Sequence, residues 1–364
     1  MDIYSTYYML AAVNELPPEP TFFKRRYFPT NVAMDIFGTS KVLADYKDSK
    51  QRRAPFVLPR IGSVSIAREG FSTYELEPGN ISISIPLTVD QLKNRGFGEA
   101  LMNGKTPAER ARMLLIGDLK ELSARISRTE ECLAIQTMID NGCVMRHQTE
   151  TPEIYEDIRV QFYDGADNPA LFTPTAKWVH SKKNTDGSWV LGNWYHDVCA
   201  MIKMLISRGL PARELLMGAD LGEFILSDPW VMAVLDNRRM EMGRIDPKEL
   251  TEYVSNPGVL KFGGRTLDLL VSDGSCEDEE TGEDVLYVPD GTAIVTAPDC
   301  GRGLYGAVTQ LEKDGEFHTY AGTRVPQHIF TLRPPAKETQ ITSRPLFAPK
   351  RKAPWSVAKN VFLV

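Results

Sequence analysis

The architecture can be inferred from one segment, TPAERARMLLIGDLKELSARISRTEECLAIQTMIDNG (106–142). Thr106 and Glu109 fit a capping box, and Pro107 occupies the first helical position, where no amide hydrogen is needed. Apolar residues recur at helical spacing on one face: Leu115, Leu119, Leu122, Ile126 and Leu133. Asn141-Gly142 is a suitable stop, so the sequence predicts a helix over 106–140, roughly 52 Å long. No second helix of similar length follows, which argues against a helical bundle.

Residues 55–90 show the alternation of apolar and polar residues that is typical of β-strands. Isoleucine or valine alternates with serine in two runs, Val64 and Ile66, then Ile81, Ile83 and Ile85. Between the runs, the polar stretch REGFSTYELEPGN (68–80) ends in a turn signal. The sequence therefore predicts a long two-stranded hairpin over 64–85 with an exposed, charged tip. An isolated hairpin is marginal in water, so its partner should be another surface, in this chain or in another.

The N-terminal segment mixes aromatic and basic residues. A short helix is predicted over 5–15 and ends at PPEP (17–20), because proline lacks the amide donor. The residues that follow include Phe22, Phe23, Arg25, Arg26 and Tyr27. This mixture suits nucleic-acid binding, but it suits equally well an arm that lies across a neighbouring subunit.

The remaining chain mixes both element types. Residues 150–195 resemble strands, helices are predicted at about 195–208 and 219–235, and apolar strands follow near 267–298. The end, 338–364, is predicted to be extended strands broken by prolines. A length of 364 residues suggests two to three domains.

Charge is distributed unevenly along the chain. The net charge is −6, with +3 on residues 1–60 and +6 on residues 331–364, which leaves −15 on residues 61–330. An acidic body with basic ends repels nucleic acid over most of its surface. With 42% apolar and 25% charged residues, the composition excludes wholesale disorder.

The sequence gives few indications of the cellular compartment in which the protein folds. The five cysteines are odd in number and far apart in sequence, which argues against a disulfide framework and fits a reducing compartment. The start, MDIYS, lacks the basic region of a secretory signal, and no apolar run is long enough to span a membrane.

The sequence offers no catalytic constellation. GRGLYG (301–306) has the spacing of a phosphate-binding loop, but no strong helix follows it. The acidic run 276–284 has the wrong ligand spacing for calcium, so a solvated hairpin tip is favoured. His196 and Cys199 could share a helix face as metal ligands or as a nucleophile pair, although a surface histidine and a core cysteine are the simpler interpretation. We therefore expect no catalytic, cofactor-binding or metal-binding residues and no enzymatic activity.

Four motifs in order carry a family resemblance: MDIYSTYYMLAAVNE (1–15), SVSIAREGFSTYELEPGN (63–80), VLYVPDGTAIV (285–295) and GRGLYGAV (301–308). Together they resemble the lambda-type phage major capsid proteins (major capsid protein E family), which have the Hong Kong 97 capsid fold. The match departs from the family pattern at Gly291, where an asparagine is usual, and in the basic run Lys350-Arg351-Lys352.

The resemblance implies an α+β Hong Kong 97-type fold. Its parts would be an N-arm (1–54), an E-loop (55–95), a P-domain (96–195) with a spine helix (106–140), an A-domain (196–328) and a C-terminal return to the P-domain (329–364). Contacts with neighbouring subunits would come from the E-loop tip, Arg68, Glu69, Glu75, Glu77, Pro78 and Gly79, and from the N-arm, Phe22, Phe23, Arg25, Arg26 and Tyr27.

The function implied is that of a major capsid protein, which self-assembles as hexamers and pentamers into the icosahedral head of a tailed double-stranded DNA phage. The protein would be assembled in the host cytoplasm and found in the virion, without a cofactor. Expected partners are a portal, a separate scaffolding protein because the arm is too short for a fused one, and weakly bound packaged DNA; a decoration protein is a further hypothesis. The alternatives are an encapsulin-like nanocompartment shell, which shares the fold, and a cytosolic hydrolase with a Cys/His pair.

Overall fold

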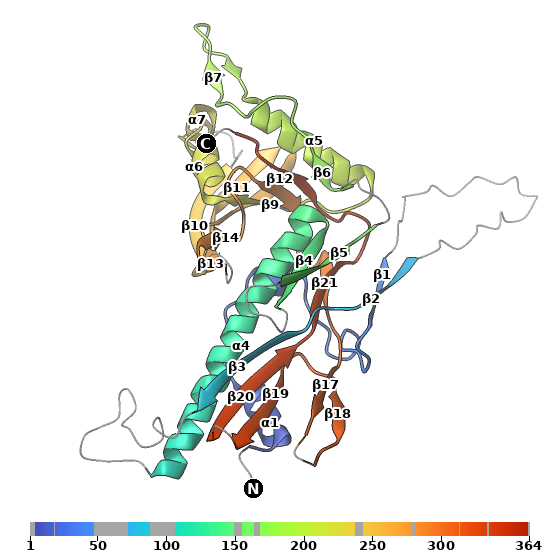
Figure 1. Cartoon of the computed structure of the whole chain (residues 1–364). Helices are drawn as coiled ribbons and strands as arrows, with labels where there is room; N and C mark the ends of the chain where they lie inside the picture. The colour runs from blue at the N-terminus through green and yellow to red at the C-terminus, as the bar shows by residue number, and fades with distance from the viewer. Residues whose placement is uncertain are drawn as a thin grey trace, which may run out of the picture.

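The structure is a computed structural model that describes residues 4–17, 19–46, 72–87, 106–148, 155–163, 168–236, 243–278, 282–312, 314–332 and 335–362. Figure 1 shows an elongated molecule in which the long helix α4 (Pro107–Asp140) connects two regions. The C-terminal end of α4 reaches a large sheet covered by short helices. Its N-terminal end lies beside a small sheet and the helix α1 (Thr6–Glu15).

The long helix forms as its sequence predicts. The Thr106 side chain accepts from the Glu109 amide and the Glu109 carboxylate accepts from the Thr106 amide, which completes the capping box. Asn141 ends the helix in the left-handed conformation, with φ 58°. The predicted apolar face is buried, and it packs in its N-terminal half against Met9 of α1 and Ile341.

A three-stranded antiparallel sheet covers that half of α4. It consists of β19 (Val325–Leu332), β20 (Pro335–Ser343) and β3 (Ile81–Leu87), in that order. Ile83 is paired with Ile341, so the isoleucine-serine run finds its partner about 250 residues away in sequence. The predicted partner of this run, residues 64–66, lies in the stretch 47–71 outside the described residues, so that pairing stays a prediction.

The stretch predicted to be an exposed hairpin tip is itself a strand. Residues Ser72–Leu76 form β2, which pairs antiparallel with β1 (Val42–Tyr46). Pro78 and Gly79 are buried between β2 and β3, and the Gly79 amide lies 3.0 Å from Met145 Sδ. These two residues redirect the chain from one sheet to another instead of reversing it, so their prediction as an exposed tip is wrong.

A seven-stranded sheet forms the other region. Its strands, in spatial order, are β10 (Gly243–Thr251), β11 (Val254–Phe262), β12 (Arg265–Ser272), β9 (Glu214–Gly218), β15 (Ala293–Thr296), β22 (Ser356–Ala358) and β6 (Leu171–Phe172). The β12/β9 and β22/β6 pairs are parallel and the others antiparallel. Side chains alternate between two cores, as Leu215 and Leu216 show, so both faces are covered.

Three helices pack on one face of that sheet: α5 (Asn193–Ser207), α6 (Ala219–Leu226) and α7 (Pro229–Asp236). The single helix predicted over 219–235 is wrong, because the chain breaks at Asp228-Pro229. Proline has no amide hydrogen with which to continue the helical hydrogen bonding. The Asp228 carboxylate accepts a hydrogen bond from the Trp230 amide at 2.8 Å and another from Trp194 Nε1 at 2.9 Å. The buried aspartate thereby fixes the start of α7.

The remaining elements are short. They are α2 (Phe23–Tyr27), β4 (Gly142–Gln148), β5 (Tyr155–Gln161), β7 (Lys182–Lys183), β8 (Trp189–Val190), β13 (Ser275–Glu277), β14 (Asp284–Leu286), β16 (Gly301–Tyr305), β17 (Val308–Leu311), β18 (Phe317–Tyr320) and β21 (Pro345–Pro349). The strands pair as β4/β5, β7/β8, β13/β14, β16/β21 and β17/β18. Within the described residues, no helix combines the length and apolar character needed to cross a membrane.

We expect Leu119→Ala to lower the free energy of unfolding by about 2–5 kcal/mol, because truncation leaves a cavity where α4 meets β20. Leu119 is 1% exposed. The control is Ile116→Ala on the same helix, where the side chain is 43% exposed and the expected change is under about 1 kcal/mol. Urea unfolding of the unassembled chain, followed by circular dichroism, measures both, and equal losses would contradict the burial of this face.

Candidate functional site: a buried ion network on the long helix

The predicted N-arm residues lie inside the chain's own core. Phe22, Phe23 and Tyr27 are buried where α2 crosses the middle of α4, so their prediction as contacts to a neighbouring subunit is wrong. Arg26 is held within the chain by Glu214. Arg25 alone among the five is exposed, and its contact with another subunit stays a prediction.

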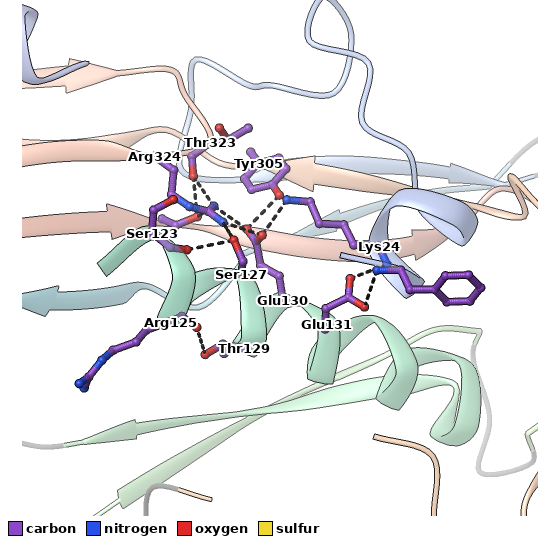
Figure 2. A network of polar contacts seen from close by, with 12 residues as sticks. Lys24, Ser123, Arg125, Ser127, Thr129, Glu130, Glu131, Tyr305, Thr323 and Arg324 are labelled. Atoms are coloured by element: carbon purple, nitrogen blue, oxygen red, sulfur yellow. Dashed lines mark hydrogen bonds and ion pairs between the residues drawn. The ribbon is translucent and has the colours of Figure 1, made fainter. Parts of the chain in front are cut away.

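Glu130 of α4 is the centre of a buried network (Figure 2). Its two carboxylate oxygens accept from both Arg324 Nη atoms, at 2.7 and 2.8 Å. Oε2 also accepts from Lys24 Nζ at 2.7 Å, and Oε1 accepts from the Tyr305 hydroxyl at 2.9 Å. The Glu130 side chain is fully buried, and Arg324 is nearly so. One carboxylate therefore binds three parts of the chain that lie far apart in sequence.

Electrostatics keep this network ionised. Burial opposes the charge on Glu130, but Arg324 and Lys24 outweigh it and lower the carboxyl pKa from 4.5 to about 2. Burial likewise disfavours the charge on both cations, yet the attraction of Glu130 leaves the pKa of Lys24 and that of Arg324 raised. All three groups are charged at neutral pH.

Glu131, the next residue, caps the short helix α2. Its carboxylate accepts from the backbone amides of Phe22, Phe23 and Lys24 at 3.1, 2.8 and 2.9 Å. These amides have no partner inside α2, and no side chain of the N-terminal segment caps them. The Tyr253 hydroxyl donates a further bond at 3.0 Å. Burial raises the pKa of Glu131, and the four donors offset this only in part.

A second ion pair links α2 to the seven-stranded sheet. Arg26 donates to Glu214 of β9 through Nη2 at 2.6 Å and through Nε at 3.0 Å, and the Tyr27 hydroxyl donates to the same carboxylate at 2.9 Å. This hydrogen bonding raises the pKa of Arg26. Segment 22–27 is therefore clamped between the long helix and the sheet.

The geometry of the network suits a structural role, because it fixes the position of α2 between the long helix and the large sheet. Each of its carboxylates is neutralised or saturated with donors, which leaves no base or nucleophile to act on a substrate. The described residues also contain no cluster of three potential metal ligands. His196 is exposed, and burial raises the pKa of the Cys199 thiol, whereas a nucleophilic cysteine needs a lowered pKa.

The described acidic residues of the predicted E-loop tip form ion pairs within the chain itself. Glu75 lies on β2 and pairs with Lys41 at 3.1 Å, and the Glu77 carboxylate lies 3.2 Å from Arg344. Arg68 and Glu69 lie outside the described residues. A subunit contact at any of these positions stays a prediction.

The sequence analysis missed the network, although one signal was present. Glu130 stands four residues after Ile126 and three before Leu133, so helical spacing puts its carboxylate on the apolar face of α4. A buried carboxylate requires partners that compensate its charge, either cations or several hydrogen-bond donors. No local pattern names Lys24 and Arg324 as those partners, because they are distant in sequence.

Comparison with known proteins gives consistent matches over nearly the whole chain. The family model for phage major capsid protein E matches residues 5–360. The major capsid protein of Enterobacteria phage P21 is 25% identical over 352 residues, which cover 95% of this chain and 96% of that protein. The major capsid protein of Escherichia phage lambda is 22% identical over 355 residues, with the same coverage. A crystal structure assigned to the capsid protein of an Escherichia coli CFT073 prophage superposes with a TM-score of 0.64 at 16% identity, covering 97% of this chain and 98% of that one.

We expect Glu130→Gln to lower the free energy of unfolding by about 3–5 kcal/mol, because it leaves two buried cations without their counter-charge. The control on the same helix is Glu121→Gln, which removes only an exposed pair with Arg125 and should cost under about 0.5 kcal/mol. Chemical denaturation of the unassembled chain at neutral pH measures both. A Glu130→Gln variant as stable as the parent would show that the buried charges contribute no net stability.

The difference in the free energy of unfolding between the parent and Glu130→Gln should depend on pH. Because the folded pKa of Glu130 is lowered to about 2, its contribution is complete above about pH 4.5 and is lost as the pH falls from there towards 2. Denaturation series of both proteins from pH 7 to pH 3 should show the difference shrinking at the acidic end. A difference that stays constant, or that grows on acidification, would contradict the lowered pKa.

Proposed function

The chain belongs to the family of phage major capsid protein E, and from that membership we propose how it builds the head shell of a tailed phage. It is a capsid protein of the virion with an α+β Hong Kong 97-type fold, a structural protein and not an enzyme. The observation that carries this conclusion is the family match over residues 5–360. A phage family favours packaged DNA as the shell contents over the cargo enzyme of an encapsulin-like nanocompartment.

We propose that the two regions of the subunit correspond to the P-domain and the A-domain. The P-domain would contain α4 with the β19-β20-β3 sheet, and the A-domain would contain the seven-stranded sheet with α5 to α7. Their separate hydrophobic clusters support this division. Strands β6 and β22 join the large sheet from outside the expected limits 196–328, so the proposed A-domain draws on more of the chain.

The strands β1 and β2, with residues 47–71 between them, are our proposal for the E-loop. This moves the E-loop towards the N-terminus relative to the expected limits 55–95. The support is the antiparallel pairing of Val42 with Leu76 through Tyr46 with Ser72, which makes a two-stranded ribbon that joins no larger sheet among the described residues. One face of the ribbon, with Val42 and Ala44, packs on the chain's own core, while Leu43 on the opposite face is 50% exposed, so we propose that a neighbouring subunit covers that face.

Exposed apolar side chains indicate further subunit contacts. Leu311 and Phe317 face each other across the β17/β18 ribbon and are 50% and 75% exposed, and Tyr7 of α1 is also exposed. Large apolar side chains grouped on a surface are typical of protein interaction sites. A shell makes many such contacts at once, so each one can be modest.

The other partners stay predictions from family membership. A separate scaffolding protein, a portal and a decoration protein would bind during or after assembly in the host cytoplasm. Packaged DNA should touch the shell only weakly, because residues 61–330 carry a net charge of −15 and phosphate binding requires cations.

Electron microscopy and static light scattering of the purified chain test the proposed function. Closed shells, tubes or five- and six-membered rings of near-megadalton mass are the expected result, either for the chain alone or after co-expression with the scaffolding protein of its phage. A particle of one to four chains under both conditions would overturn the proposal.

We expect Phe317→Gln to reduce the yield of shells at least tenfold while leaving the thermal midpoint of the unassembled subunit unchanged. The exposed ring contributes nothing to the subunit's own core, but its loss removes apolar contact at every copy in the shell. Phe317→Leu keeps an apolar side chain and serves as the matched control, with near-normal assembly. Sedimentation of shells from free subunits measures the yield, and normal assembly of the glutamine variant would remove this ribbon from the interface.

A further inference from the structure

Two cysteines from distant parts of the chain meet beside the long helix. Cys132 lies on α4 and Cys276 on β13, and their Sγ atoms are 2.7 Å apart. This separation falls between the length of an S–S bond, about 2.0 Å, and ordinary packing contacts of about 3.5–4.0 Å. Both side chains are partly buried, so they are neither sealed inside the core nor loose on the surface.

The chain around this pair is held firmly in place. Both cysteines pack against the main hydrophobic core near Tyr287, whose ring centroid lies 5.4 Å from that of Tyr253. Gly274 brings the backbone before β13 close to these rings, since an added Cβ there would lie 2.6 Å from Tyr253 Cβ. The two sulfurs therefore lie close together in the folded chain, and bond formation requires them to approach by about 0.7 Å.

The other three cysteines have different surroundings. Cys143 and Cys300 are buried, and Cys300 Sγ lies 3.6 Å from Thr296 Oγ1. Cys199 is partly buried on α5 beside Tyr195. Among the residues that the structure describes, only Cys132 and Cys276 are in contact as two thiols.

We propose that Cys132 and Cys276 are a redox site, at which exchange with a small-molecule disulfide of the glutathione type forms an intramolecular cross-link between α4 and the β13/β14 hairpin. The hairpin is a separate two-stranded sheet, so the bond would attach it covalently to the helix that connects the two regions.

The exchange balances in two steps. The Cys276 thiolate attacks one sulfur of the small disulfide, which forms a mixed disulfide on Cys276 and releases the first small thiolate. That thiolate takes the proton of Cys132, and the Cys132 sulfur then attacks Cys276 Sγ and expels the second small thiolate. The second small thiolate takes up from water the proton that Cys276 lost when it ionised. Two protein thiols and one small disulfide give one protein disulfide and two small thiols, so two electrons pass to the small molecule.

The surroundings fit these two roles. A hydrogen bond from the Cys132 thiol lowers the pKa of Cys276, against the opposing effects of burial and of Asp278 and Asp284. The same hydrogen bond, together with burial, raises the pKa of Cys132. Cys276 also lies between the exposed Ser275 and Glu277, whereas Cys132 lies between the buried Glu131 and Leu133, so the small disulfide reaches Cys276 first and Cys132 is the resolving thiol.

The timing of this cross-link rests on the proposed function. In a reducing host cytoplasm both thiols stay reduced, so the subunit can adjust its shape while the shell forms. After release into an oxidising medium, the bond would fix the hairpin to α4. The cross-link lies within one subunit, so it can form in a free chain as well as in a shell.

Peptide mapping without reduction tests the proposal. The full chain, as free subunits or shells, is incubated with oxidised glutathione in excess over reduced glutathione, alkylated and digested. The expected product is a peptide pair joined through Cys132 and Cys276, two hydrogens lighter than the two separate peptides, and it should disappear on treatment with dithiothreitol. Thermal unfolding should show the oxidised chain about 5 °C more stable than the reduced chain, because the bond closes a long loop.

Matched variants separate this site from general oxidation. Cys276→Ser should abolish both the linked peptide and the thermal shift, while Cys199→Ser should retain both. If Cys132 and Cys276 remain fully alkylatable under oxidising conditions, or carry only glutathione, the proposal is wrong. That result would leave shell formation untouched, so it is distinguishable from failure of the proposed function, which electron microscopy measures on the same samples.

Discussion

Glu130 puts a negative charge in the middle of the molecule, and that charge is tolerable only if Arg324 and Lys24 reach it. This requirement brings the N-terminal segment and the chain leading into β19 onto the same turn of the long helix. Glu131 and Glu214 extend the constraint, since they hold α2 against the helix and the large sheet. A well-packed apolar cluster could be equally stable, but ion pairs of fixed geometry allow fewer alternative positions of the packed segments. We interpret the network as fixing α2 and the chain before β19 on the long helix, next to the main hydrophobic core that α4 shares with the large sheet.

The parts of the fold that depend on local signals could be predicted from the sequence. The capping box, the proline after it and the leucine spacing define α4 almost to the residue. The isoleucine-serine run was identified as a strand, but its pairing was not, because Ile341 is about 250 residues away and alternation carries no information about the partner. Pro78-Gly79 was a turn signal in the right place, yet a turn can lead to a new sheet as readily as back along the old one.

The candidate site was harder to predict, for a related physical reason. Aromatic and basic residues at 22–27 look the same in sequence whether they cover a neighbour or enter the chain's own core. The carboxylates that decide between these alternatives, Glu131 and Glu214, are separated from them by about 100 residues or more. Once those partners are known, the aromatic residues belong to the core, and the surfaces that we propose for neighbours are the β17/β18 ribbon and the β1/β2 ribbon.

The position of β22 has a consequence for biosynthesis. This strand, Ser356–Ala358, lies between β15 and β6 inside the large sheet, and both neighbours are translated well before it. Until these residues have been synthesised, the position between β15 and β6 in the sheet is unfilled, and Trp355 is absent from the core. Pairing over such sequence distances folds slowly and late. The large sheet is therefore completed by the last of the described strands to be synthesised, after the helices and strands that surround it.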